Sequence, residues 1–162
     1  MVTTRVFRLL LIGTLLTCIW MLASDSKWAH DGPKFTELQN AKKKDDANKV
    51  LKGWSDRDRR WVTMAMIADM VFAVCYLLLI AASCLRASQN AHTRWVIVAG
   101  LLFAAGAVLG GLCDLIENAT MLVMLSGTAT DFLVTVMSSM QVPKFLLPVL
   151  AAFYGLFAHF DV

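Results

Sequence analysis

Four long apolar stretches run through this chain of 162 residues, and they constrain its fold more than any other feature. They cover about residues 6–23, 61–85, 95–125 and 131–160. A helix needs roughly 20 apolar residues to cross the hydrocarbon core of a bilayer, and a hydrophobic content of 58% is too high for a soluble domain of this size. The sequence therefore predicts an all-α, polytopic integral membrane protein whose single membrane domain, 1–162, is a four-transmembrane-helix bundle.

The charged residues gather in a polar loop, 24–60, between the first two apolar stretches. This loop holds ten of the fifteen Lys and Arg residues and seven of the twelve Asp and Glu residues. The segment Thr36-Glu37-Leu38-Gln39 resembles a capping box and Gly53 is typical of a helix end, so we expect a short surface helix between them. Its Lys42-Lys43-Lys44-Asp45-Asp46 run is interpreted as a solvated face, with a lipid-headgroup or partner patch as the alternative.

The ends of the apolar stretches give further expectations. Arg5 and Arg8 before the first stretch are also typical of a signal peptide, but Trp20 suits an interfacial anchor, so a retained helix is predicted. The charges that flank this helix favour an inside N-terminus, whereas the total of bases favours the polar loop inside; because the first helix usually dominates, we expect both termini inside. Pro143 and Pro148 predict a last helix that is kinked or built from two pieces.

Two carboxyl groups and an amide lie near the far end of the third apolar stretch. Asp114, Glu117 and Asn118 are spaced at i, i+3 and i+4, so they share one helix face. A charged group at bilayer depth costs on the order of 2.5 to 3.5 kcal/mol on insertion scales. Such groups persist only with partners, which must come from the neighbouring helices.

The short connectors between stretches allow these partners to be predicted. If the second and third helices form an antiparallel hairpin centred near residue 91, Asp69 lies level with Asp114; a turn near residue 128 brings Lys144 to the same level. Lys144 is the only Lys or Arg after Trp95, so we expect an ion pair between Lys144 and Asp114, surrounded by Asp69 or Glu117. The predicted intramembrane polar cluster is Asp69, Asp114, Glu117, Asn118, Lys144 and Tyr76.

Glycines precede the carboxyl groups on the same helix. Gly106, Gly110, Asp114 and Asn118 follow at intervals of four, and Gly111 stands beside this stripe. Small residues at this spacing let a neighbouring backbone approach closely. Gly106, Gly110 and Gly111 are therefore predicted to pack against other helices, and the alternative is a glycine-rich helix without specific partners.

The motif Asp114-Leu115-Ile116-Glu117-Asn118, with Lys144 and Tyr154 in the last helix, resembles a group of small, uncharacterised four-helix integral membrane proteins that carry D-x-x-E-N in the third helix. The resemblance covers roughly the last hundred residues and leaves the polar loop unmatched. It implies a fold and does not imply a reaction.

The sequence favours a non-catalytic role without a cofactor. Cys18, Cys75, Cys84 and Cys113 lie in apolar runs without metal-ligand spacing, so they are interpreted as buried hydrophobes and no metal site is predicted. Haem is disfavoured because the three histidines lie in loops or at the chain end. Glutathione-utilising membrane enzymes also have four helices and a Glu-Asn pair, but the arginines that would bind the thiol cofactor are missing around Glu117.

Three functions stay open at this stage. The first is an accessory or scaffold subunit of a larger membrane complex, in which the buried Asp/Glu/Lys layer fixes helix packing. The second is proton or cation translocation through that layer, although no inverted repeat is visible. The third is an enzyme acting on a lipid-like substrate. The expected partners are membrane lipids and other membrane subunits or a second copy of the chain, with no nucleic acid, in a bacterial plasma membrane or an organellar membrane.

Overall fold

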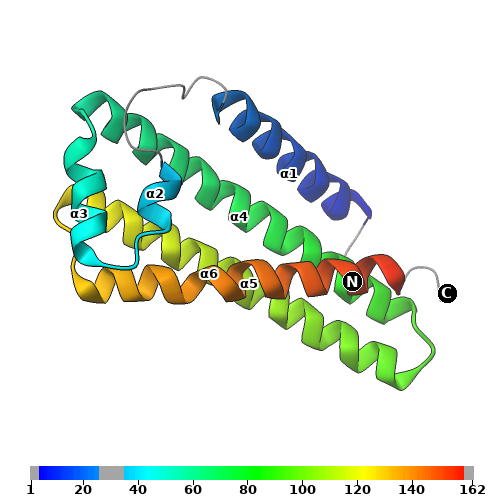
Figure 1. Cartoon of the computed structure of the whole chain (residues 1–162). Coiled ribbons are helices and arrows are strands. Elements are labelled where there is room, and N and C mark those ends of the chain that lie inside the picture. Colours follow the sequence, from blue (N-terminus) through cyan, green and yellow to red (C-terminus); the bar gives the residue numbers. More distant parts are fainter. Residues whose placement is uncertain (1–3, 26–34, 159–162) are drawn as a thin grey trace.

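The computed structural model describes residues 4–25 and 35–158, and these form six helices and no strand (Figure 1). The prediction of an all-α chain is therefore confirmed. Residues 26–34 of the polar loop and the last two residues of the predicted stretch 131–160 lie outside the described part. The helices are α1 Thr4–Asp25, α2 Phe35–Gln39, α3 Lys44–Gly53, α4 Asp56–Asn90, α5 Arg94–Ser126 and α6 Asp131–Phe157.

Three of these helices, α4, α5 and α6, are long and apolar enough to cross a membrane. They contain the predicted stretches 61–85 and 95–125 and most of 131–160. α4 has 35 residues, which at a rise of about 1.5 Å per residue gives roughly 50 Å, more than the hydrocarbon thickness of about 30 Å. These lengths and compositions are those of an integral membrane protein.

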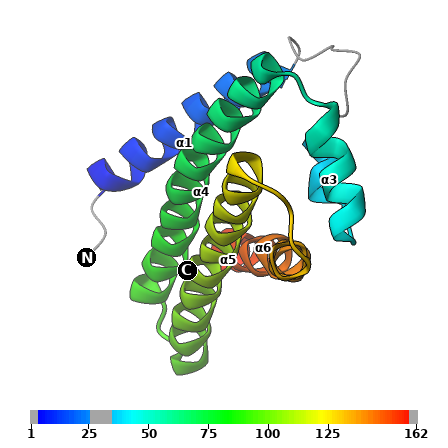
Figure 2. The ribbon, with the colours of Figure 1, turned by 90° about the vertical axis from the view of Figure 1, so that its left-hand side faces the viewer.

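Consecutive long helices run antiparallel, so α4 and α6 point in the same direction and α5 in the opposite one (Figure 1). α5 contacts both α4 and α6, α4 also contacts α6, and α1 packs against α4. Figure 2 shows α1 on the side of α4 that faces away from α6. The core of the fold is thus a three-helix bundle of α4, α5 and α6, with α1 flanking it.

Polar groups define where the helices end. Ser55 and Asp58 form a capping box at the start of α4, and the Thr130 hydroxyl accepts from the Leu133 N–H at the start of α6. Arg59 binds two helix C-termini at once, since its guanidinium donates to the Leu51 carbonyl of α3 at 2.6 Å and to the Leu125 carbonyl of α5 at 3.2 Å. These carbonyls have no partner inside their own helices, so a cation there stabilises both ends.

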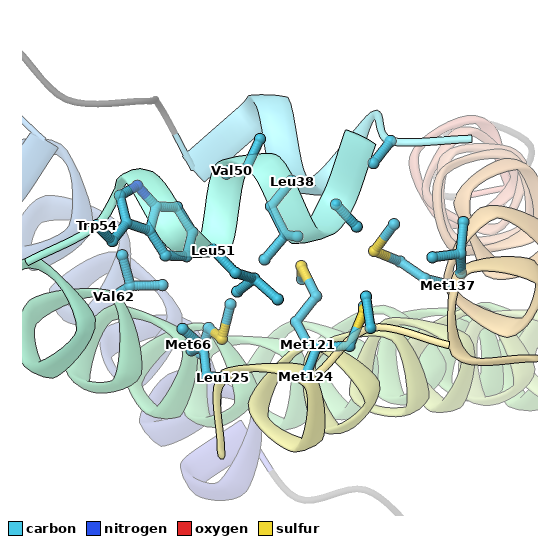
Figure 3. Close-up of a cluster of buried hydrophobic side chains, with 14 residues drawn as sticks. Leu38, Val50, Leu51, Trp54, Val62, Met66, Met121, Met124, Leu125 and Met137 are labelled. Atoms are coloured by element: carbon cyan, nitrogen blue, oxygen red, sulfur yellow. The ribbon is translucent and has the colours of Figure 1, made fainter. Parts of the chain in front are cut away.

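The polar loop folds onto one end of the bundle. Where the sequence predicts one surface helix, the structure has α2 and α3, which place Leu38, Val50, Leu51 and Trp54 against α4, α5 and α6 (Figure 3). Asn48 of α3 also holds the turn between α5 and α6, because its side chain donates to the Ala129 carbonyl at 3.1 Å and accepts from the Ala129 N–H at 2.9 Å. The run 42–46 remains exposed. The segment therefore has a buried apolar face and a charged outer face.

α6 is one continuous helix through both of its prolines. The sequence leaves two alternatives for this segment, and the one built from two pieces is not realised. Proline removes one backbone hydrogen bond, and neighbouring helices tolerate this in membrane segments. Pro148 is buried against α5, where the backbone of Gly110 leaves space for its ring.

Candidate functional site

The six residues of the predicted polar cluster lie on the three long helices of the bundle. Asp69 and Tyr76 are on α4; Asp114, Glu117 and Asn118 are on α5; Lys144 is on α6. Lys144 occupies the middle of α6, 13 positions from Asp131 and 13 from Phe157 (144 − 131 and 157 − 144). We call these six residues the polar layer.

The Lys144 ammonium is the centre of the polar layer. Its Nζ atom lies 3.3 Å from Asp114 Oδ1 and 2.9 Å from Glu117 Oε2, and only 6% of its side chain is exposed. The predicted ion pair with Asp114 is thus present. Glu117 is a direct partner at a shorter distance, because it lies one helical turn after Asp114 on the same face of α5.

The Oδ2 atoms of Asp114 and Asp69 each accept a hydrogen bond from another side chain. The Tyr76 hydroxyl donates to Asp114 Oδ2 at 3.1 Å, and the Asn118 amide donates to Asp69 Oδ2 at 2.8 Å. Both bonds join α4 to α5. Polar contacts therefore connect α4 to α5, and α5 to α6, at the same level of the bundle.

Glu117 is fully buried and has a partner that sequence reasoning missed. The Gln39 amide of α2 donates to Glu117 Oε1 at 2.7 Å, and the Gln141 amide of α6 donates to the Gln39 carbonyl. Gln141 precedes Lys144 by three residues and shares its face, which is a signal in the sequence; nothing in the sequence marks Gln39. The end of α2 is thus tied to the polar layer.

The second carboxylate oxygen of Glu117, Oε2, has a different partner from Oε1. Oε2 makes the ion pair with Lys144, but the contact lacks the directionality of a hydrogen bond, and Oε2 accepts no hydrogen bond from the described residues. Lys144 also lies 4.9 Å from the centre of the Phe145 ring, within range of a cation–π interaction. Among the described residues, the Lys144 ammonium is therefore the ionic partner of Glu117 Oε2, an oxygen that accepts no hydrogen bond from them.

The glycines of α5 differ in what surrounds them. A Cβ added at Gly110 would lie 2.4 Å from Pro148 Cδ of α6, and one at Gly111 would lie 2.4 Å from Leu77 Cδ2 of α4. Nothing lies within 4 Å of a Cβ added at Gly106. The close contacts between α5 and its neighbouring helices next to the polar layer therefore occur at Gly110 and Gly111, and Gly106 makes no such contact.

A second set of polar contacts lies toward the other end of the bundle. The Tyr154 hydroxyl donates to the Val96 carbonyl at 2.6 Å, and the Ser88 hydroxyl donates to the Ile97 carbonyl at 2.9 Å. The Cys84 thiol donates to the Ala151 carbonyl at 3.2 Å. These bonds join side chains of α4 and α6 to backbone carbonyls of α5 and α6, so they hold neighbouring helices together.

The chemistry of the polar layer is that of ion pairing and hydrogen bonding. In the part of the chain that the structure describes, no three His, Cys, Asp or Glu residues are grouped so that they could hold a metal ion. Cys18, Cys75, Cys84 and Cys113 are free thiols. The layer contains three carboxyl groups and one ammonium, and two of the carboxyl groups, those of Asp114 and Glu117, contact the ammonium directly.

Comparison with protein-family models, with curated proteins and with solved structures finds no significant match to this chain.

Proposed function

We propose that this chain is a small integral membrane protein that serves as a non-catalytic accessory or scaffold subunit of a larger membrane assembly, with the polar layer fixing how its helices pack. The observation that carries the proposal is the position of Lys144, which is buried between two carboxylates of α5. A paired ammonium of this kind favours one register, because a shift of one helical turn would separate it from at least one of its two carboxylates.

The pairing pattern supports a structural role. Each side chain of the polar layer contacts another from a different helix, and Gln39 adds a contact from the polar loop. A residue used for turnover would instead present a reactive atom to a substrate space. Polar contacts between helices specify register in membrane bundles, where apolar packing alone discriminates weakly between arrangements.

The outer surface supports a role in contacts. Large apolar side chains are exposed along α1, α4, α5 and α6, among them Leu9, Leu102 and Phe153. In a bilayer such faces contact lipid or other helices. The partner expected from this surface is another membrane subunit or a second copy of the chain.

The proposal includes α1 as a fourth membrane span. α1 has 22 residues, about 33 Å of helix, which matches the hydrocarbon thickness of about 30 Å. It lies antiparallel to α4, so its first residues are at the same end of the bundle as residues 91–93, which connect α4 to α5 (Figure 1). With four spans, both termini lie on one side of the membrane and the polar loop on the other.

Labelling of single cysteines by a membrane-impermeant maleimide tests this topology. In a variant without the native cysteines, we expect Arg5→Cys and Gln89→Cys to react from one side of the membrane and Lys43→Cys to react from the opposite side. Reaction of Arg5→Cys from the same side as Lys43→Cys would contradict the fourth span. Reaction of Gln89→Cys from that side would contradict the crossing of α4.

One observation favours proton or cation translocation as a second candidate. The polar layer has three carboxyl groups for one ammonium, and Glu117 Oε2 accepts no hydrogen bond from the described residues. Carboxyl groups in excess of cations within a membrane can carry a proton or attract a cation. The same residues would then form part of a route through the bilayer.

The substitution Glu117→Gln separates the two functions. The amide keeps the shape of the side chain and an acceptor for Gln39, so under the scaffold proposal we expect a folded chain and no difference in proton flux between native and variant liposomes. The measurement is the decay of an imposed pH gradient in liposomes that contain the purified chain. A flux through the native chain that Glu117→Gln abolishes, without loss of folding, would establish the second candidate and overturn the first.

A further inference from the structure

A groove with a polar end and an apolar end lies between α2 and α6. Its volume is about 590 Å³, and it is lined by Gln39, Asn40, Gln141, Val142, Phe145, Leu146 and Val149. The amide side chains and the apolar side chains occupy separate ends. Gln141 comes before the apolar residues along α6, and its side chain binds the carbonyl of Gln39, the neighbour of Asn40. The groove therefore has the polarity of a single amphiphilic molecule.

The outward side of α6 changes character at this groove. Before it, the hydroxyl side chains of Thr135 and Ser139 are exposed together with the ring of Phe132; from Val142 onward all exposed side chains are apolar, with Val142 and Phe145 at 70% and 64% exposure. The hydroxyls of Thr135 and Ser139 are exposed, so this part of α6 suits the headgroup region, and the apolar turns from Val142 onward suit hydrocarbon. The boundary between headgroups and acyl chains thus passes through the groove on this face of α6.

A second pocket with lysine side chains adjoins the polar end of the groove. It measures about 620 Å³, and the polar residues that line it are Glu37, Asn40, Lys42, Lys43, Asp46 and Lys49. Asn40 lines both pockets, so they are neighbours. Three lysines and two acidic residues line this second pocket, which therefore has an excess of positive charge on the headgroup side of the boundary.

We propose that the two pockets together bind one anionic glycerophospholipid. An acyl chain lies along Phe145, Leu146 and Val149, and the phosphate lies among Lys42, Lys43 and Lys49. The ester and glycerol oxygens meet the Asn40 amide and the second amide hydrogens of Gln39 and Gln141, whose first hydrogens bind Glu117 and the Gln39 carbonyl. The order of these groups along the site, apolar, then amide donors, then ammonium, is the order of chemical groups along such a lipid. The proposal needs membrane insertion and does not depend on the scaffold role.

The position of Phe145 connects this lipid to the polar layer. The Phe145 ring lines the groove and also lies 4.9 Å from Lys144 Nζ. Gln39, which binds Glu117, lines the groove as well. An acyl chain in the groove therefore covers the side of the polar layer that faces α2 and holds α2 against α6.

A lipid titration of the purified full chain in nonionic detergent, followed by native mass spectrometry, tests the site. The probes are phosphatidylglycerol and phosphatidylcholine with the same acyl chains. Since each Lys near an anionic headgroup region contributes on the order of a fivefold factor, we expect at least about fivefold tighter binding of phosphatidylglycerol. Equal affinity for the two lipids would overturn the proposal.

Substitutions distinguish the proposed site from general attraction to a basic protein. We expect the double variant Lys42→Gln, Lys43→Gln to lose most of the preference for phosphatidylglycerol. The matched control Lys52→Gln, Arg57→Gln removes the same charge from the same end of the molecule, outside both pockets, and is expected to keep the preference. An equal loss in both double variants would refute the site.

The apolar end is tested in the same way. Leu146→Trp fills the groove and is expected to weaken binding of both lipids, whereas Leu150→Trp, on the same helix but outside the groove, is expected to leave it unchanged. Unchanged binding with Leu146→Trp would show that the acyl chain lies elsewhere and would overturn the proposal.

Discussion

Replacement of Lys144 by Met is expected to lower the free energy of unfolding by about 3–5 kcal/mol, the range typical for the loss of one partner from a buried ion pair. The substitution keeps the length and apolar volume of the side chain but removes the ammonium. Asp114 and Glu117 would then face each other as carboxyl groups without a cation, in a site where both are almost fully buried. The measurement is unfolding by sodium dodecyl sulfate from mixed micelles, followed by circular dichroism.

Neutralisation of the acidic partners is expected to reverse most of this loss. In the triple variant Lys144→Met, Asp114→Asn, Glu117→Gln, no charge of the central ion pairs remains, and the amides keep acceptors for Tyr76 and Gln39. Replacement of a complete buried ion pair by neutral groups is often close to neutral in stability. We therefore expect the triple variant to be more stable than Lys144→Met alone, close to the unchanged chain.

The exposed lysine Lys52 provides the control. Lys52→Met removes the same group from the outer face of α3 and is expected to change the free energy of unfolding by less than about 0.5 kcal/mol. A triple variant no more stable than Lys144→Met would show that the ammonium contributes by packing alone. A small effect of Lys144→Met itself would show that the ion pair does not specify the bundle.

The depth of Asp114 and Lys144 could be predicted from the sequence because the connectors are short. Three residues separate α4 from α5 and four separate α5 from α6, by the bounds Asn90, Arg94, Ser126 and Asp131. With so few linking residues, antiparallel helices have little freedom of register, and a rise of about 1.5 Å per residue fixes which side chains are level. The sequence predicted Asp69 or Glu117 around the pair, whereas Glu117 contacts Lys144 directly, since depth alone does not decide between neighbouring turns.

The contacts of the polar loop could not be predicted from periodicity. Gln39, Asn48 and Arg59 bind groups far away in sequence, namely Glu117, the Ala129 backbone and the Leu125 carbonyl. Each is a polar residue in a polar segment, where an exposed position is the usual outcome. Only the arrangement of the bundle end, with its free carbonyls and a buried carboxylate, gives these side chains their partners.

The glycine stripe shows a different limit of sequence reasoning. Spacing at intervals of four identifies one helix face, but it does not give the height at which another helix crosses that face. In the structure α6 approaches at Gly110 through Pro148, whereas Gly106 lies beyond the close contact. The neighbouring Gly111, which lies off the stripe, makes its own close approach to Leu77 of α4.

Replacement of Leu38 by Ala is expected to cost about 2–5 kcal/mol of unfolding free energy, as for other Leu-to-Ala changes in packed cores. Leu38 is the one described residue of α2 that is fully buried, and it packs in a cluster with Met121, Met124 and Met137 (Figure 3). α2 has only 5 residues, too few to be stable alone, so its helix depends on this side chain.

The Leu38→Ala substitution is also expected to destabilise the polar layer, because Gln39 follows Leu38 directly and binds Glu117. If α2 leaves the bundle, Glu117 Oε1 loses its donor while remaining near Lys144. Hydrogen exchange of the backbone amides in 35–53 is the measurement, and we expect faster exchange in Leu38→Ala together with faster exchange around Glu117. The control Leu112→Ala removes an exposed leucine from α5 and is expected to leave both segments protected. Faster exchange in α2 without any change around Glu117 would mean that the polar layer keeps its structure without Gln39, and the layer would then belong to α4, α5 and α6 alone.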